Sequence, residues 1–78
     1  MQNYRLLTSL KIGEKSRVVK LLAEDSMRRR MQDIGLIEGT EIECVLKSPA
    51  NDPIAYRIRG AVIAFRNEDS NNIVISEG

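Results

Sequence analysis

Three consecutive arginines, residues 28–30, are the side chains of this sequence best suited to chemistry. An arginine inserted into another protein's site can stabilise the charge that develops during phosphoryl transfer, and clustered arginines can bind nucleic acid. On a helix, successive residues point about 100° apart, so the run spreads around the surface instead of forming one basic face. A purely structural interpretation stays open, in which Arg29 and Arg30 pair with Asp33 while Arg28 is solvated.

The sequence offers few groups for metal binding or acid–base catalysis. It contains one cysteine, Cys44, and no histidine. Histidine is the side chain that most readily exchanges a proton near neutral pH, and ferrous sites usually combine imidazole or thiolate with carboxylate. A lone cysteine in an apolar strand is typical of a core residue. We therefore expect no catalytic residue, no metal site and no cofactor, and we predict that the protein is not an enzyme.

The charge balance and the length of the sequence argue against a nucleic-acid-binding, multidomain or membrane-inserted protein. The 78 residues carry 12 Lys and Arg against 11 Asp and Glu, a formal net charge of +1. Because this balance creates no long-range field for polyanions, we expect no nucleic-acid partner. The length predicts a single domain, residues 1–78. The apolar runs are too short for a signal peptide or a membrane span, so we expect a cytoplasmic protein without direct membrane insertion.

A short helix is predicted after the first long strand. Residues 17–23 are rich in Val and Leu and predict that strand. Residues 24–26 then supply carboxylates and an N-cap candidate for the positive end of a helix. The apolar stripe of this helix recurs at i, i+4 and i+7, at Met27, Met31 and Ile34. Gly35 fits a left-handed helix stop, which places Leu36 against Met31.

Two further strands are predicted, over residues 40–47 and 54–59. Both alternate between apolar and charged side chains, with inward sets of Ile42, Cys44 and Leu46 in the first and Ile54, Tyr56 and Ile58 in the second. If residues 48–53 join the two strands as an antiparallel hairpin, the two apolar sets lie on the same face of the sheet only when the numbers of paired residues sum to an even value. We predict the register that places Glu43 opposite Arg59 and Cys44 opposite Ile58.

The rest of the sequence predicts a small barrel. Gly60 permits a bulge or a sharp bend before a strand at residues 61–66. Residues 67–72 form a turn or a single helical turn, and residues 73–75 form a short closing strand. About five short strands, with one helix inserted after the first long strand, indicate a mainly β protein that folds as a partly open barrel.

Apolar residues beside the arginines are a candidate docking surface. Leu36 and Ile37 are consecutive, and an exposed apolar residue rimmed by arginine is typical of protein-binding surfaces. The candidate partner-binding residues here are Arg28, Arg29, Met31, Leu36 and Ile37. In the alternative interpretation, Leu36 closes the helix stop and Ile37 fills the end of the barrel.

The connection between the two alternating strands is a second candidate contact. Its residues are Pro49, Asp52 and Pro53, and the prolines restrict its conformation. The alternative interpretation is a plain hairpin connection.

In the order and spacing of its residues the sequence resembles the FeoA family, ferrous-iron transport protein A. The matching segments, in chain order, are Gly13-Glu14, Val18-Val19, Arg29-Arg30-Met31, Asp33-Ile34-Gly35-Leu36, Gly39-Thr40, Ser48-Pro49, Asp52-Pro53-Ile54, Gly60, Phe65-Arg66, and Ile73 with Ile75. These segments cover nearly the whole chain.

The resemblance implies an SH3-like β-barrel and a small cytoplasmic accessory protein of bacterial ferrous-iron uptake. The implied partner is FeoB, a ferrous-iron permease with a guanine-nucleotide-binding domain, contacted on its cytoplasmic side. Regulation of the permease's assembly or GTPase activity would follow from such contact, and the arginines of residues 28–30 are candidates for an arginine finger. The sequence also leaves open a weak homo-oligomer.

An alternative resemblance is to the C-terminal module of DtxR-type metal-dependent repressors, which is a similar small barrel. In that class the barrel follows a DNA-binding helix-turn-helix and a metal-binding dimerisation region. The alternative function is therefore an SH3-like regulatory module of a transcriptional repressor.

Overall fold

The computed structural model describes residues 4–76. The elements in chain order are β1 (Tyr4–Leu6), the 3₁₀ turn η1 (Leu7–Ser9), β2 (Lys15–Leu21), α1 (Asp25–Ile34), β3 (Glu41–Lys47), β4 (Ile54–Ile58), β5 (Ala61–Phe65), α2 (Asn67–Ser70) and β6 (Ile73–Ser76). Within this range neither helix has the length and apolar character needed to cross a membrane.

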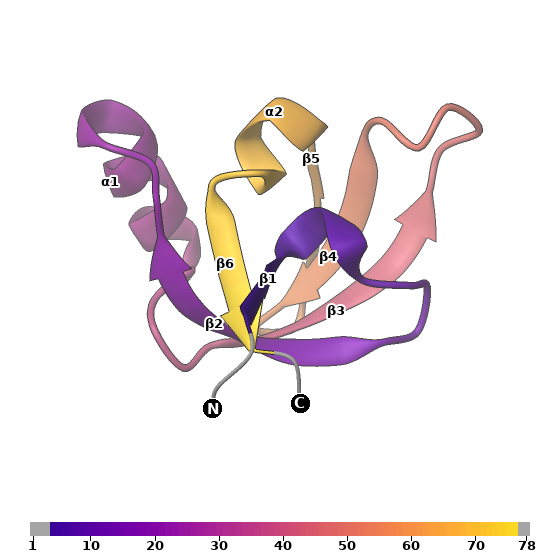
Figure 1. Cartoon of the computed structure of the whole chain (residues 1–78), viewed down its shortest axis with the longest axis horizontal. Coiled ribbons are helices and arrows are strands. Elements are labelled where there is room, and N and C mark those ends of the chain that lie inside the picture. Colours follow the sequence, from indigo (N-terminus) through magenta and orange to yellow (C-terminus); the bar gives the residue numbers. More distant parts are fainter. Residues whose placement is uncertain (1–3, 77–78) are drawn as a thin grey trace.

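The six strands form one antiparallel sheet in the order β1-β6-β2-β3-β4-β5. The sheet curls strongly, with α1 at one side and α2 at the top (Figure 1). It does not close, because β1 and β5 are its two edges. The predicted mainly β, partly open barrel is therefore confirmed, with a sixth strand, β1, which pairs with β6 at the opposite end of the chain.

The first long strand begins and ends two residues earlier than predicted, at Lys15–Leu21 instead of residues 17–23. It starts directly after the turn at Gly13, where the Gly13 N–H donates to the Cys44 carbonyl and the Cys44 N–H donates to the Glu14 carbonyl. Pairing with β3 thus recruits Lys15 into the strand. A long-range contact of this kind extends a strand beyond its apolar residues.

The register of β3 and β4 differs from the predicted one. Glu43 lies opposite Arg57 instead of Arg59, and Cys44 lies opposite Tyr56 instead of Ile58. Two shifts of one residue produce the difference. At the loop the strands are offset by one residue, with Lys47 opposite Ile54 instead of Ala55, and Val45 is an extra residue that forms a bulge between Cys44 and Leu46.

The bulge also changes which side chains of β3 face the core. A shift of one residue would turn the side chains to the other face of the sheet, and a second shift turns them back. Ile42 and Cys44 therefore remain buried, as predicted. Beyond the bulge the alternation reverses, and Leu46 is 63% exposed. The prediction that Leu46 faces inward was therefore wrong.

One core fills the concave side of the sheet. It joins side chains from η1, α1 and five of the strands, and its fully buried members are Leu7, Leu10, Val18, Leu36, Ile42, Cys44, Tyr56, Ile58, Ile73 and Ile75. The rings of Tyr56 and Phe65 contact each other with centroids 6.2 Å apart. Burial raises the pKa of Tyr56 to about 12, so its phenol stays neutral at any ordinary pH.

Candidate protein-binding site

The helix stop after α1 forms as predicted. Gly35 takes a left-handed conformation with φ 104°, and its N–H donates to the Gln32 carbonyl at 2.9 Å. The Leu36 N–H donates to the Met31 carbonyl, also at 2.9 Å, which is the Schellman arrangement. Leu36 is 0% exposed and Met31 is 2% exposed. Both side chains belong to the core, so neither can contact a partner directly.

The start of α1 differs from the predicted cap. Glu24 occupies the N-cap position without a side-chain cap hydrogen bond, and the helix begins at Asp25. Ser26, the residue whose type suits an N-cap, therefore lies inside the first turn. Asp25 still places a carboxylate at the positive end of the helix.

The loop at residues 35–40 holds Ile37 on the surface, 49% exposed. The Thr40 hydroxyl donates to the Gly35 carbonyl at 2.9 Å and accepts from the Ile37 N–H at 3.2 Å. The Gly39 N–H donates to the Val18 carbonyl at 2.7 Å, which ties the loop to β2. Because its backbone is fixed from both sides, this loop presents Ile37 without needing to order on binding.

The arginine run is exposed along α1, at Arg28, Arg29 and Arg30. The predicted pairs with Asp33 do not form: among residues 4–76 the ion pairs are Arg5 with Glu14 and Arg57 with Glu43. Along the helix axis Arg28 lies about 9 Å and Arg30 about 6 Å before the last helical residue, Ile34, and Ile37 follows in the loop beyond it.

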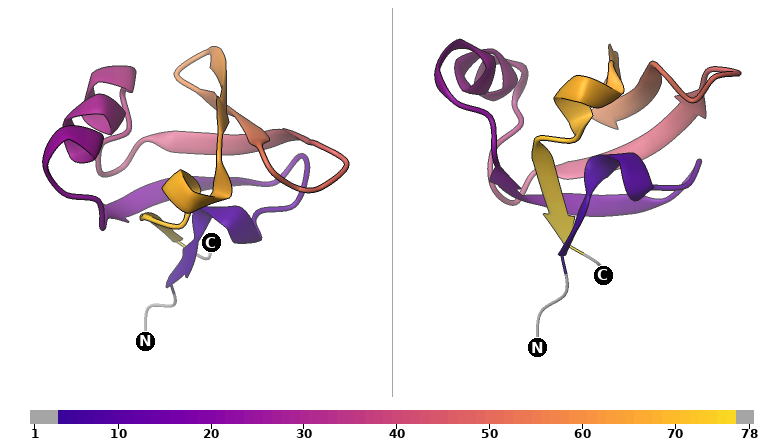
Figure 2. Two further views of the ribbon diagram at one scale, coloured as in Figure 1. Left: turned by 90° about the horizontal axis from the view of Figure 1, so that it is seen from above. Right: turned by 45° about the horizontal axis from the view of Figure 1, so that its top comes forward.

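The loop at residues 48–53 is tied to the rest of the fold. The Asp52 carboxylate accepts from the Asn67 N–H at the start of α2, at 3.0 Å, and the Asn67 amide donates to the Asn51 carbonyl at 2.8 Å. Pro49 and Asp52 are exposed, whereas Pro53 is half-buried. Viewed from above, this loop lies at the end of β3 opposite α1 (Figure 2).

The candidate contact residues are thus distributed over three separate places: α1, the Ile37 loop and the β3–β4 loop. Ile37 combines high exposure with a fixed backbone. Arg28 and Arg29 are exposed on a helix, and Asp52 already has a structural role at the start of α2.

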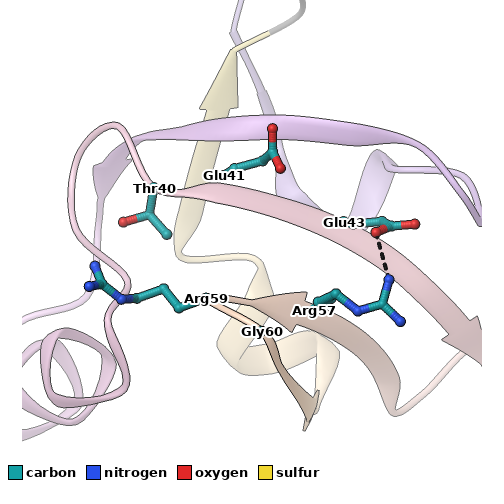
Figure 3. Close-up of a pocket in the computed structure, with 6 residues that line it drawn as sticks. All are labelled: Thr40, Glu41, Glu43, Arg57, Arg59 and Gly60. Carbon is teal, nitrogen blue, oxygen red and sulfur yellow. Dashed lines mark hydrogen bonds and ion pairs between the residues drawn. The ribbon is translucent and has the colours of Figure 1, made fainter.

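An open cleft of about 260 Å³ lies on the outer side of the sheet (Figure 3). It is lined by Thr40, Glu41, Glu43, Arg57, Arg59 and Gly60. The Arg57 guanidinium donates to the Glu43 carboxylate at 2.9 Å, across β4 and β3. On the next strand, Lys15 lies opposite Glu43 and Arg17 lies opposite Glu41. Charges of opposite sign therefore alternate across the strands, which stabilises this register.

Arg59 has a role that the sequence analysis did not assign. Its side chain reaches from the β4–β5 turn toward the Ile37 loop (Figure 3). The Arg59 stem lies over Gly35, where a Cβ would collide with the Arg59 Cδ atom. Arg59 therefore joins the helix stop to the β4–β5 turn. The two-residue Arg-Gly pair between apolar strands is the local signal for this turn.

The described residues contain no cluster of three or more His, Cys, Asp or Glu side chains that could hold a metal ion. Cys44 is 0% exposed, and burial raises the pKa of its thiol. The prediction of a core cysteine is confirmed.

Comparison with known proteins assigns the family. Residues 5–77 match the family model described as the FeoA domain. The FeoA-like protein of Clostridium acetobutylicum is 33% identical, with a TM-score of 0.85 over 96% of this chain and 87% of that one. The Stenotrophomonas maltophilia FeoA, solved with zinc and described as a prokaryotic SH3 domain protein, has a TM-score of 0.81 at 23% identity, over 91% of this chain and 88% of that one.

A curated relative extends the comparison to a larger protein. The Fe(2+) transport protein A/Fe(2+) transporter FeoB fusion protein of Porphyromonas gingivalis is 29% identical over 69 residues. The match covers 88% of this chain but only 8% of the fusion protein.

Sheet order, open edges and inserted helix together define an SH3-like β-barrel. The family match covers nearly the whole chain, in agreement with the resemblance of its motifs. The chain belongs to the FeoA family, an accessory family of ferrous-iron transport. A manganese-dependent transcriptional repressor shares the fold, with a TM-score of 0.86 over 97% of this chain and 42% of that one, but at 17% identity the likeness extends to the fold alone.

Proposed function

We propose that this protein is a non-enzymatic accessory of ferrous-iron uptake that binds the cytoplasmic side of a FeoB-type permease and alters its assembly or activity. The observation that carries the proposal is the Porphyromonas gingivalis fusion, in which a homologous domain and FeoB share one polypeptide. Fusion keeps two domains at a high effective concentration, which is useful when they act on each other. A separate chain would make the same contact by diffusion.

The Ile37 loop is the proposed docking anchor. Its isoleucine is about half exposed, and a set of hydrogen bonds within the loop and to Val18 holds the backbone around it. The Arg59 side chain lies beside the loop and supplies a charged rim (Figure 3). An apolar centre with arginine at its edge is the composition of protein interfaces. Leu36, which is fully buried, supports this loop from beneath.

A matched pair of substitutions tests this anchor. Ile37 and Ile12 are the same residue type and are 49% and 59% exposed, but Ile12 adjoins the Gly13 turn, which is bonded to Cys44 in the middle of β3. We expect Ile37→Asp to weaken binding to the full-length permease in nanodiscs by about tenfold or more, since truncating an interface hot spot costs at least 1–2 kcal/mol. Ile12→Asp should stay within twofold of the unmodified protein.

Calorimetry or surface plasmon resonance supplies the affinities, and circular dichroism verifies that both variants are folded. If the unmodified protein binds neither the permease in nanodiscs nor its isolated cytoplasmic part, the proposed function is wrong. If it binds and both variants bind equally well, the anchor lies elsewhere on the surface.

A further inference from the structure

The sheet leaves β5 with backbone groups that point away from its neighbour. β4 and β5 are joined by a two-residue turn, in which Arg59 and Gly60 have φ of 51° and 85°. In such a hairpin the residues that flank the turn, Ile58 and Ala61, form a hydrogen-bonded pair, and the pattern alternates from there. The N–H and C=O groups of every second residue of β5, Val62 and Ala64, are therefore directed toward the open edge.

The residues of β5 carry none of the sequence features that usually block further strand pairing, and the neighbouring element is α1, whose Met27, Met31 and Ile34 side chains line a small pocket with Phe65 at the end of the strand. Its five residues, 61–65, contain no charge and no proline, and Ala61, Val62 and Ala64 are exposed. Natural edge strands are commonly shortened or carry charged side chains. The other edge of the sheet, β1, fits that description, because it is three residues long and includes Arg5.

An apolar row on the outer side of the sheet leads to the same edge. Leu46 lies opposite Ala55, and Ala55 lies opposite Ala64, so one row crosses three strands and ends at β5. Leu46 is 63% exposed and Val62 is 56% exposed. A strand added beside β5 would extend this row, and an apolar side chain there would cover it.

The two ends of β5 are both cationic. Arg59 lies in the turn before the strand and Arg66 follows its last residue, and both are exposed. Among residues 4–76 neither has an ion-pair partner. An added strand that places carboxylates at these two ends would be complementary to them.

We propose that β5 accepts an added antiparallel strand from the partner protein: an extended apolar segment with acidic residues at both ends. The identity of that partner as the permease rests on the proposed function, whereas the chemistry of the added strand rests on β5 itself. The β5 edge begins beside the proposed anchor, because Arg59 packs on Gly35 of the Ile37 loop. One partner segment could thus contact Ile37 and continue along β5.

A second copy of this chain is a poorer occupant of the same edge. Antiparallel pairing of two β5 strands satisfies the outward groups best when Val62 of each copy lies opposite Ala64 of the other. This register places Arg66 of each copy beside the Arg59-Gly60 turn of the second copy. Like charges that adjoin across strands are destabilising, and here the contact would occur twice.

Amide hydrogen exchange by NMR tests the proposal directly. In the free protein the Val62 and Ala64 amides should exchange quickly, while the Ala61 and Ile63 amides, which face β4, are protected. Saturating permease in nanodiscs should slow exchange at Val62 and Ala64 by at least tenfold. A synthetic nine-residue peptide of alternating Val and Thr with Asp and Glu at both ends should do the same, whereas the version with Lys at both ends should not.

Two variants separate backbone pairing from side-chain contact. Ala64→Pro removes the outward N–H but leaves the bonds to β4, so the folded variant should bind at least tenfold more weakly. Ala64→Ser keeps the N–H and should bind within threefold of the unmodified protein. Exchange in the unmodified protein decides the question if Ala64→Pro does not fold.

The outcomes distinguish this inference from the proposed function. Permease that binds without slowing exchange at Val62 and Ala64 overturns the added strand and leaves the accessory role intact. A peptide that slows exchange while the permease does not bind overturns the permease as partner and supports the strand-accepting edge. Slowed exchange that appears in the protein alone as its concentration rises identifies a second copy as the occupant and overturns the acidic-partner assignment.

Discussion

At the scale of single residues, charged side chains in this protein stabilise loops more than they form a reactive site. The Glu14 carboxylate accepts from the Lys11 N–H at 2.9 Å and from the Arg5 guanidinium, and it thereby joins the turn before β2 to the edge strand β1. The hydrogen bond from the Lys11 backbone, followed by the one from Arg5, holds the pKa of Glu14 below its usual range. The ionised form is therefore the form that the fold prefers.

This preference predicts a pH dependence of stability. Because the pKa of Glu14 is lower in the folded state, its contribution is fully present above the ordinary glutamate pKa of 4.5 and is lost as the pH falls through the folded value. The difference in melting temperature between the protein and Glu14→Gln should be constant above about pH 5 and should shrink steadily below pH 4. Thermal melts between pH 3 and 7 measure it, and a difference that does not change with pH would contradict the assignment.

At the scale of elements, the end of α1 depends on a contact with the β4–β5 turn. Gly35 and Gly13 both have positive φ, 104° and 88°, but only at Gly35 would a Cβ meet another side chain, that of Arg59. The helix stop and the turn are thus packed together, and each restricts the other. The sequence marks both as turns without showing that they touch.

A double-mutant comparison measures that contact. Gly13→Ala should cost about 1–2 kcal/mol, the usual penalty of a left-handed non-glycine residue. Gly35→Ala should cost more, because Arg59 must also move. In an Arg59→Ala background the two substitutions should become equally costly. Urea denaturation gives the free energies, and equal costs in the presence of Arg59 would refute the contact.

The bulge in β3 decides how much two similar apolar side chains, Ile42 and Leu46, contribute to stability. Regular alternation predicts that Ile42 and Leu46 are both buried, but Val45 reverses the facing and only Ile42 is buried. We expect Ile42→Ala to cost about 2–5 kcal/mol and Leu46→Ala to stay within about 0.5 kcal/mol. Chemical denaturation of the two variants checks this difference. A large loss for Leu46→Ala would mean that the strand pairs without the bulge in solution.

At the scale of the whole molecule, the open sheet separates the surfaces that a partner could contact. The arginines of α1 are exposed on the helix, the Ile37 loop follows that helix, and Arg59 packs on Gly35 at the start of the loop and leads into β5. A protein with one small core cannot move these surfaces relative to each other without unfolding. A partner must therefore match their fixed arrangement.

This arrangement predicts how the arginines act on the permease. If contact occurs through the Ile37 loop, the double variant Arg28→Ala, Arg29→Ala should leave GTP hydrolysis by the permease within about twofold of the rate measured with the unmodified protein. An arginine finger would instead lose about a thousandfold or more of its stimulation. Hydrolysis rates with permease in nanodiscs decide between these outcomes, and Ile37→Asp serves as the binding-deficient control.

Local patterns decided much of the fold in advance. Met27, Met31 and Ile34 predicted α1, and Gly35 predicted its stop, because helix periodicity and a left-handed cap depend on near neighbours. The alternating strands β3 and β4 were predicted for the same reason. Their register was not predicted, because the bulge at Val45 and the offset at the loop each shift the pairing by one residue, and neither can be recognised from the alternation of apolar and charged residues.

The candidate site shows the same division. Consecutive Leu36 and Ile37 indicated that one of them would be exposed, but only packing decided that Leu36 fills the core and Ile37 does not. The sequence also gave no sign that Arg59 contacts Gly35.

By itself, the sequence determined the family, the charge balance, the helix and the strands, since these depend on residue types and their short-range order. The tertiary structure alone decided the pairing of β1 with β6, the two open edges and the exposure of Leu46 and Val62. These features arise from contacts between residues far apart in the chain, and such contacts leave no local pattern when the pairing groups belong to the backbone.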